Sequence, residues 1–460
     1  MSQTLPRHIA VIDIGKTNAK VVLIDRERGA QIAALSRPND VLRDGLYPHA
    51  DVDGLWDFIL ASLGTLQADH RIDGISITTH GATAALVTDT GLALPVLDYE
   101  FDGPEASRQD YTEARPPFAE TLSPPLPNGL NLGAQIFWQA ATYPDEFAAV
   151  KRILTYPQYW AWRLTGVAAS EVTSLGCHTD LWNPGSGDFS TLVSRQGWRH
   201  LFPELRPAAS ILGPILPEIA ARTGLATETP VTCGIHDSNA SLVPHLARKD
   251  TPFSVVSAGT WTICMTVGGS TDGLDEARDS LANVDAFGRP VPTARFMGGR
   301  EWGLLVTRIV APSAADTSDI IARNVHVLPG TVPGAGPFSG AKGGWNVDPQ
   351  SLSDGQRNAA VSLYLALMTR ECLGLCGLGN MIVVEGPLAR NTLFCAALGR
   401  LSDVPVYASG DSTGTSMGAS LLFGGSGGAT TQHAVPPMDI EGLEDYAAMW
   451  RSRVRDNSLT

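Results

Sequence analysis

The sequence predicts an α/β protein built from two domains of one type. Its 460 residues exceed what a single hydrophobic core accommodates, and at roughly 100 to 200 residues per domain we expect two or three domains. A strand, a Gly-centred turn and a second strand over residues 9–25 recur over residues 253–267, which indicates an internal duplication. Apolar strands alternate with helical stretches in both halves of the chain, as they do in α/β folds.

The first domain is expected over residues 1–246 and opens with a β-hairpin. Residues 9–25 contain two apolar, β-branched runs around a polar tip, which is the pattern of two paired strands. We expect a strand to follow at 74–79, then an extended stretch at 86–97 and a helix-rich region at about 133–164.

The second domain is expected over residues 247–460, because the segment 245–252 is polar and ends in proline. The second hairpin, at 253–267, follows at once. The later elements are expected to be a helix at 354–378, a strand at 381–385, a helix from 391, a Gly-rich turn at 409–418 that leads into a helix, and a final helix at 440–451.

The charge balance argues against nucleic acid as a partner. Lys and Arg number 33 against 47 Asp and Glu, the net charge is −14, and no basic run occurs. An anionic small ligand remains compatible with this charge, because backbone N–H groups bind phosphate without a net positive charge.

The sequence gives no sign of a targeting segment or a membrane span. An apolar strand begins near His8 and is interrupted by Asp13, which does not fit a signal peptide, and no apolar run approaches the roughly 20 residues of a span. We therefore expect a soluble, cytoplasmic protein with no membrane partner.

The six cysteines form no dense framework, and we expect reduced thiols. The spacing of Cys372 and Cys376 fits helix packing better than a zinc site.

The tripeptide Gly15-Lys16-Thr17 invites a P-loop interpretation, which fails on two grounds. A P-loop needs a glycine five residues before Gly15, where this chain has Ala10. It also needs a helix after the Lys-Thr pair, whereas residues 21–24 are β-branched and strand-like.

A phosphate-binding hairpin tip is the remaining functional interpretation of this segment. Asp13 precedes Gly15 by two positions, and Lys16, Thr17 and Asn18 follow. Such a tip can hold phosphates through N–H groups and hydroxyls while the carboxylate anchors a hydrated Mg²⁺. Taken alone, the segment fits an ordinary turn with a solvated Asp equally well.

A second acidic position stands between a predicted strand at 230–233 and a helix-like run at 240–246. Asp237 at such a junction is either a helix N-cap or a carboxylate aimed at a ligand. In the second case it can take the proton of a hydroxyl that attacks phosphorus. His236 either binds the substrate or is a structural histidine, and we favour the first.

Two further Gly-rich turns can contact a nucleotide. Gly259 and Thr260 repeat the phosphate-binding chemistry in the second hairpin, and Gly414 and Thr415 offer flexible backbone at the start of a helix. Each turn alone is a common feature, but their order along the chain, together with the two acidic positions, is informative.

This set of segments resembles the FGGY carbohydrate kinases, which share the duplicated actin/hexokinase-like fold. The resemblance covers roughly residues 9–425 and is carried by Val11-Ile-Asp-Ile-Gly-Lys-Thr17, Gly234-Ile-His-Asp237, Ser257-Ala-Gly-Thr260 and Gly414-Thr-Ser-Met-Gly418. It implies two ribonuclease-H-like domains with an active-site cleft between them. It also implies ATP-dependent phosphorylation of a sugar or polyol hydroxyl.

The resemblance implies a role for each anchor. Asp237 would be the general base, Asp13 would organise Mg²⁺, Thr17 and Thr260 would contact phosphates, and Gly414 would belong to the adenosine pocket. The expected ATP site also includes the neighbouring residues Gly15, Lys16, Asn18, Gly259 and Thr415.

The sugar is harder to assign from the residues. His80 and Gly81 end a strand where ketose kinases of the family carry sugar-binding residues, and Asp98 occupies a second such place. With His236 and Asp237 they form the expected substrate site. An Arg-Glu pair of the glycerol-kinase type is absent near His80, and the His-Asp pair resembles the rhamnulose and fuculose kinase branch. We therefore expect a ketose or related sugar.

Two segments depart from the family pattern. Glu385-Gly386-Pro387 stands where the family often has a Gly-Gly-Gly turn before the adenosine-pocket helix, and the loop 333–340 matches no family segment, so no role transfers to it.

Two other functions fit the same fold. One is a catalytically silent nucleotide or sugar sensor, and the other is an ATPase that acts on no sugar. The presence of both Asp13 and Asp237 favours the kinase. The resemblance further implies a homodimer, for which the linear sequence offers no surface signal.

Overall fold

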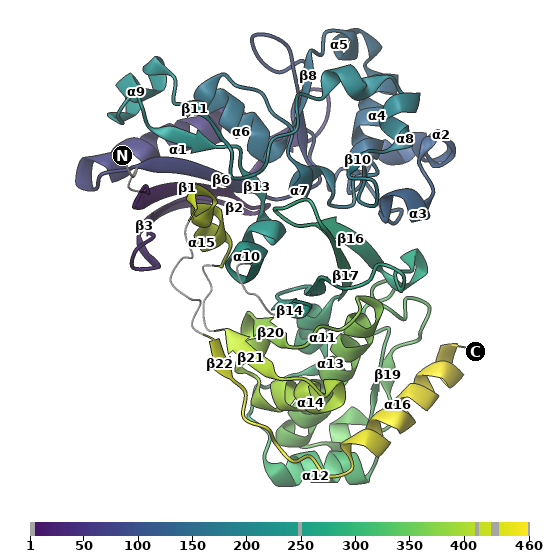
Figure 1. Ribbon diagram of the computed structural model, residues 1–460. Helices are drawn as coiled ribbons and strands as arrows, with labels where there is room; N and C mark the ends of the chain where they lie inside the picture. The colour runs from purple at the N-terminus through teal and green to yellow at the C-terminus, as the bar shows by residue number, and fades with distance from the viewer. Residues whose placement is uncertain (1–4, 247–250, 410–413, 425–431, 459–460) are drawn as a thin grey trace. The chain divides into compact units, whose positions relative to one another are not determined.

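The computed structural model describes residues 5–246, 251–409, 414–424 and 432–458. The chain divides into two compact units (Figure 1). The first unit takes residues 1–247, 282–290 and 413–429, and the second takes 248–281, 291–412 and 430–460. The linear sequence gave no signal that two later segments group with the first unit.

The first unit is built on a sheet with the strand order β11-β12-β6-β1-β2-β3, in which β13 also pairs with β6. The strands are β1 (His8–Ile14), β2 (Asn18–Asp25), β3 (Ala30–Pro38), β6 (Gly74–Thr79), β11 (Ile211–Pro214), β12 (Pro230–Thr232) and β13 (Ile235–His236). The predicted hairpin is confirmed: β1 and β2 pair antiparallel from His8 opposite Asp25 to Ile14 opposite Ala19.

Both faces of this sheet are covered by helices. Successive residues of β1 point to opposite faces, so they belong to two different cores. Ala10 and Ile12 pack in a core with α1 (Val52–Asp69), α6 (Tyr156–Thr165) and α9 (Pro217–Thr223). Ile9 and Val11 pack on the other side with α10 (Asp237–Leu246) and α15 (Gly414–Ser420). The second set of helices carries residues of the site.

The packing of α15 against α10 requires a glycine. A Cβ on Gly418 would lie 1.8 Å from the backbone oxygen of Ala240, so a side chain there would force the two helices apart.

A further apolar core in the first unit lies around β7 (Ala84–Val87) and β8 (Arg152–Thr155). Of the stretch expected to be extended at 86–97, only its first two residues belong to a strand. The helices around this core include α2 (Arg108–Ala114), α4 (Leu132–Thr142), α7 (Val172–Leu175) and α8 (Thr191–Arg195).

The second unit repeats the same pairing scheme. Its sheet has the order β16-β17-β15-β14-β20-β21-β22. β14 (Phe253–Ala258) pairs antiparallel with β15 (Thr262–Val267) and parallel with β20 (Ile382–Glu385), as β1 does with β2 and β6. The predicted duplication is therefore confirmed at the level of topology. The other strands of this sheet are β16 (Ser280–Val284), whose residues 282–284 group with the first unit, β17 (Pro290–Phe296), β21 (Val406–Ser409) and β22 (Gln432–Ala434).

The helices of the second unit surround one large core. They include α11 (Gly298–Leu305), α12 (Ala314–Ala322), α13 (Asp354–Leu375), α14 (Thr392–Ser402) and α16 (Leu443–Ser458). α13 begins where Ser353 and Gln356 form a capping box. The predicted helices at 354–378 and from 391 are found within a few residues of these bounds, whereas the helix predicted at 440–451 begins at Leu443 and runs seven residues further, to Ser458. Of the Gly-rich turn at 409–418, residues 410–413 lie outside the described residues.

The six cysteines are free and buried, and Cys372 and Cys376 pack in the core of the second unit. Within the described ranges, no group of three or more His, Cys, Asp or Glu side chains is arranged to hold a metal ion. No helix in the described part of the chain is both long and apolar enough to cross a membrane.

Candidate active site

Two strands that pair with β6 in the first unit bring acidic residues to its end: Asp13 lies in β1, and Asp237 directly follows β13. β1 aligns Asp13 with Thr78, and β13 aligns Ile235 with the same residue from the other side; both pairings are parallel. Three residues therefore lie at the carboxyl ends of these parallel strands: Asp13 near the end of β1, His80 just after β6 and Asp237 just after β13. Ligands of open α/β sheets bind at the carboxyl ends of parallel strands.

Asp13 is almost buried, with 8% of its surface exposed. Its Oδ2 accepts a hydrogen bond of 2.8 Å from Ser416 Oγ at the start of α15. Burial raises the pKa of Asp13, and the negative charge of Asp237 adds to this, while Ser416 and Lys20 act in the opposite direction. The two carboxylates therefore repel each other.

The hairpin tip after Asp13 is a tight turn held from both sides. Gly15 N–H donates to the Asn18 carbonyl at 2.9 Å, and Asn39 donates to the carbonyls of Thr17 and Gly15 at 2.9 and 2.8 Å. The side chains of Thr17 and Asn18 are exposed and hydrogen-bonded to each other at 3.1 Å. Their polar atoms are thus open to a ligand.

The Lys16 side chain points toward Asp98, a residue predicted at the sugar, and toward its neighbours. Its Nζ forms an ion pair with Asp98, lies 3.4 Å from Glu100 Oε2, and sits 4.9 Å from the ring centre of Tyr99. The structure thus joins Lys16, expected at the phosphates, to Asp98, expected at the substrate.

Asp237 is the first residue of α10, and its side chain is 31% exposed. Its Oδ1 accepts from Ser238 N–H at 2.6 Å, and Ser238 Oγ lies at 3.3 Å. His236 Nε2 lies 3.2 Å from the same oxygen. No hydrogen bond to Oδ2 is found among the residues that the structure describes.

His80 faces this carboxylate from the end of β6. Its Nδ1 lies 3.0 Å from the Gly81 carbonyl, and its ring packs edge-on against Tyr99. Burial lowers the pKa of His80, and the positive charges of Lys16 and His236 lower it further. The Gly81 carbonyl and Asp237 act in the opposite direction. The ring is therefore neutral: Nδ1–H donates to the carbonyl and Nε2 can accept a hydrogen bond.

His236 is 4% exposed, and protein atoms contact both of its ring nitrogens. Nδ1 lies 2.6 Å from Asn239 Oδ1, and Nε2 faces Asp237. Its backbone N–H donates to Thr173 Oγ at 3.1 Å. Gly81 makes room for the ring, since a Cβ there would lie 2.7 Å from Nε2.

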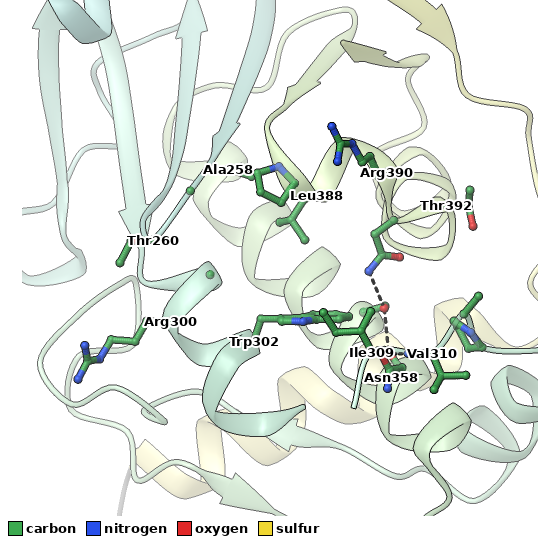
Figure 2. A pocket seen from close by; sticks show the side chains of 17 residues that line it. Ala258, Thr260, Arg300, Trp302, Ile309, Val310, Asn358, Leu388, Arg390 and Thr392 are labelled. Carbon is green, nitrogen blue, oxygen red and sulfur yellow. Dashed lines mark hydrogen bonds between the residues drawn. The ribbon is translucent and has the colours of Figure 1, made fainter. Parts of the chain in front are cut away.

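The second unit contains a cavity of about 630 Å³ beside the tip of its own hairpin. Figure 2 shows the Trp302 side chain, from α11, extending across this cavity. Gly386 has a φ of +77°, and a Cβ there would lie 2.0 Å from the Ala258 carbonyl, so the Glu385-Gly386-Pro387 turn packs directly against the hairpin. The lining residues near the hairpin and the base of α14 include Ala258, Gly259, Thr260, Trp302, Leu388 and Asn391.

Two polar side chains of this cavity, Asn358 and Asn391, are hydrogen-bonded to its wall (Figure 2). Asn358 accepts from Val310 N–H at 3.3 Å. It also donates to the Arg308 carbonyl at 2.8 Å. Asn391 donates to Ser362 Oγ at 2.8 Å. These two amides are therefore held by the protein itself.

The structure separates some of the residues expected at the nucleotide. Gly259 and Thr260 line the cavity of the second unit, whereas Gly414 and Thr415 do not and belong to the first unit. Sequence reasoning missed several residues of both sites. These are Ser416 against Asp13, Tyr99 against His80, Thr173 and Asn239 against His236, and Trp302, Asn358 and Asn391 in the cavity.

Comparisons with known proteins agree with this arrangement. Residues 128–244 match the N-terminal domain of the FGGY family of carbohydrate kinases, and residues 250–433 match the C-terminal domain. A solved carbohydrate kinase from Novosphingobium aromaticivorans is 38% identical, with a TM-score of 0.92 over 98% of this chain and 99% of that one.

Two curated relatives are L-fuculokinases. The one from Escherichia coli K12 is 24% identical over 90% of this chain and 91% of its own length. The one from Salmonella typhi is 27% identical, and the match spans 57% of each chain.

The two units have the duplicated actin-like ATPase fold, with one ribonuclease-H-like sheet in each. The protein is a sugar kinase, and the chain belongs to the FGGY family of carbohydrate kinases.

Proposed function

We propose that this kinase transfers the γ-phosphoryl group of ATP to a hydroxyl of a ketose or related sugar, with Asp237 as the general base. The observation that carries the proposal is the state of the Asp237 carboxylate. Oδ1 is held by Ser238 and faces His236, while Oδ2 has no hydrogen bond among the described residues. A free carboxylate oxygen at the carboxyl edge of the sheet suits proton removal from a bound hydroxyl.

In this reaction the sugar hydroxyl gives its proton to Asp237 Oδ2 as its oxygen bonds to the γ-phosphorus. The bond between the γ-phosphorus and the bridging oxygen breaks, and ADP leaves. Phosphoryl transfer asks the protein chiefly for positioning and charge stabilisation. The Thr17 hydroxyl and the backbone of the first hairpin tip, and Gly259 and Thr260 in the second, are the phosphate contacts that we propose.

Asp13 suits a magnesium ion. It is a nearly buried carboxylate with one hydroxyl partner and a second carboxylate near enough to raise its pKa, so a cation would relieve the repulsion. A single protein carboxylate is typical of Mg²⁺, which keeps waters and binds substrate phosphates. When bound, the ion would neutralise the charge that develops on the transferring phosphoryl group.

We assign the sugar to the wall that contains His80, Gly81 and Asp98. Neutral His80 offers an accepting Nε2, and the Asp98 ion pair with Lys16 offers both acceptor and donor atoms. Paired donors and acceptors of this kind suit a polyhydroxy ligand, whose buried hydroxyls need partners. The names of the L-fuculokinase relatives support a ketose.

We assign the adenosine to the cavity of the second unit. Its volume of about 630 Å³ and its apolar lining suit a purine nucleoside, and Trp302 offers an aromatic face for stacking. Gly259 and Thr260 at the hairpin end of the cavity would meet the phosphates. Gly414 and Thr415 do not line it, and their part in this site rests on the family resemblance alone.

The test is an ADP-release assay with Mg·ATP over a panel of ketoses, aldoses and polyols. We expect strong release with one or two ketoses and little without sugar. Release independent of sugar would indicate an ATPase, and silence despite nucleotide binding would favour a sensor.

Asp237→Asn tests the base directly. We expect the variant to bind ATP normally and to lose turnover by at least roughly 100-fold. Asp145→Asn, an exposed position on α5 (Pro144–Ala148), is the matched control and should keep normal turnover. Near-normal turnover of Asp237→Asn would remove this residue from the mechanism.

A further inference from the structure

The backbone of His236 is fixed by a buried chain of hydrogen bonds. His236 N–H donates to Thr173 Oγ at 3.1 Å, and the Thr173 hydroxyl donates to Glu171 Oε2 at 2.5 Å. Glu171 is completely buried and also caps α7 through the N–H of Thr173. The backbone position of His236 therefore depends on β13 and α7.

The neighbouring amide determines where one proton of the ring lies. Asn239 Nδ2 donates to the Val284 carbonyl, so the amide cannot be turned around without setting two oxygens against each other. Its Oδ1 therefore faces His236 Nδ1 at 2.6 Å. An amide oxygen only accepts, and Nδ1 must carry a hydrogen.

The other nitrogen faces a second group that only accepts. Nε2 lies 3.2 Å from Asp237 Oδ1, and an ionised carboxylate attracts this nitrogen only if it too carries a hydrogen. Both contacts are satisfied together by an imidazolium. Burial alone lowers the pKa of His236, but Cys177, Asp237 and Asn239 outweigh it and raise the pKa.

The charged surroundings of the ring come from several elements. Cys177 after α7, Glu171 at its start and Asp237 at the start of α10 favour the cation, and His80 after β6 opposes it. The charges of Cys177, Glu171 and Asp237, when these groups are ionised, thus favour a proton on one ring that is shielded from solvent.

We infer that His236 is a positioning residue, protonated on both ring nitrogens, whose Nε2 forms an ion pair with Asp237 Oδ1 so that Oδ2 is left for the reacting hydroxyl. The inference rests on the proposed role of Asp237 as the base. It gives His236 a role through Asp237 instead of a direct contact with the sugar. It also explains Gly81, whose missing side chain leaves the space that the ring occupies.

The first test is nitrogen NMR of the wild-type protein labelled with ¹⁵N-histidine, the His236 signals being assigned with His236→Leu. We expect both ring nitrogens to remain protonated from about pH 6 to pH 8, above the ordinary histidine range. A single protonated nitrogen at about pH 7.5 would overturn the inference. Undiminished turnover of Asp237→Asn would contradict the proposed base instead, so the two failures can be told apart.

The second test is kinetic. His236→Leu should lower kcat roughly 10- to 100-fold, as expected for a misplaced catalytic group, and leave the KM values for sugar and ATP within about twofold. The matched control His200→Leu, at an exposed histidine, should leave both unchanged. A raised sugar KM with normal kcat would make His236 a substrate contact and overturn the inference.

A variant that keeps His236 provides an independent check. Gly81→Ala puts a methyl group 2.7 Å from the original position of Nε2 and should also lower kcat, because the ring cannot move without losing Asn239 or Asp237. Gly91→Ala is its control, since a Cβ there meets nothing within 4 Å. Equal turnover of the two glycine variants would contradict the inference.

Discussion

Ser416 donates a hydrogen bond of 2.8 Å to Asp13, although 403 positions separate the two residues in the sequence. The bond joins the first strand of the chain to α15, one of its last helices. It leaves the proposed magnesium carboxylate with one fixed oxygen, so the direction of the other oxygen depends on a residue near the C-terminus.

Replacing Ser416 by alanine should weaken the response to magnesium. The variant removes the hydroxyl partner of a carboxylate that is only 8% exposed, which costs roughly 1–3 kcal/mol where a buried charged group loses its bond. We expect the Mg²⁺ concentration for half-maximal ADP release to rise several-fold with an unchanged sugar KM. Ser420→Ala, which removes a local bond to Met417 in the same region, should not shift the Mg²⁺ response.

Replacing Lys16 by methionine distinguishes its two possible roles. The side chain pairs with Asp98 and Glu100, so we expect the sugar KM to rise about tenfold while the ATP KM stays within about twofold. Lys151→Met, at an exposed position, is the control. A rise confined to the ATP KM would instead indicate that Lys16 binds the phosphates, as the hairpin motif predicts.

Replacing Trp302 by alanine should weaken nucleotide binding alone. Base stacking on an aromatic side chain contributes roughly 1–3 kcal/mol, so we expect the ATP KM to rise at least about fivefold with little change in the sugar KM. Trp345→Ala, which removes a half-buried tryptophan from the same unit outside the cavity, controls for general loss of stability. Equal effects of the two variants would argue against stacking.

A buried histidine should make the second unit acid-sensitive. His326 is completely buried against Tyr446, and burial, with a smaller effect of Arg453, lowers its pKa to about 4. The unfolded chain takes up a proton near pH 6.5 and the folded chain does not, so stability should fall as the pH drops from about 6.5 to about 4. The loss from this residue should be roughly 2–3 kcal/mol.

Urea unfolding at about pH 7 and pH 4.5 measures this loss. His326→Leu has no proton to take up, so its stability should fall less over this interval than that of the wild type. An identical fall in both proteins would show that other groups cause the acid sensitivity.

The fold could be predicted from the sequence where the signal is local. The two hairpins, the strand at 74–79 and the helix from residue 354 are marked by apolar runs and Gly-centred turns, and each lies close to its expected bounds. These signals come from residues near one another in the chain. The grouping of 282–290 and 413–429 with the first unit has no such local signal. It depends on contacts between these segments and residues far earlier in the chain.

The site could be predicted only in part for the same reason. Asp13 and Asp237 stand at strand ends, which a sequence reveals, and the structure brings both to the two sides of β6. The direction of the Lys16 side chain is set by Asp98, which lies 82 positions away, and the backbone N–H of His236 is bound by Thr173, 63 positions away. Side-chain orientation of this kind follows from tertiary contacts and not from spacing.

The place of α15 in the first unit has a consequence for biosynthesis. One face of the first sheet, formed by Ile9, Val11, Val22 and Ile24, is completed by Met417, Leu422 and Phe423. A nascent chain synthesised only as far as residue 246 can cover part of this face with α10, but the part that Met417, Leu422 and Phe423 cover stays exposed, and exposed apolar surface promotes aggregation. The first unit is therefore completed only after residue 423 has been synthesised.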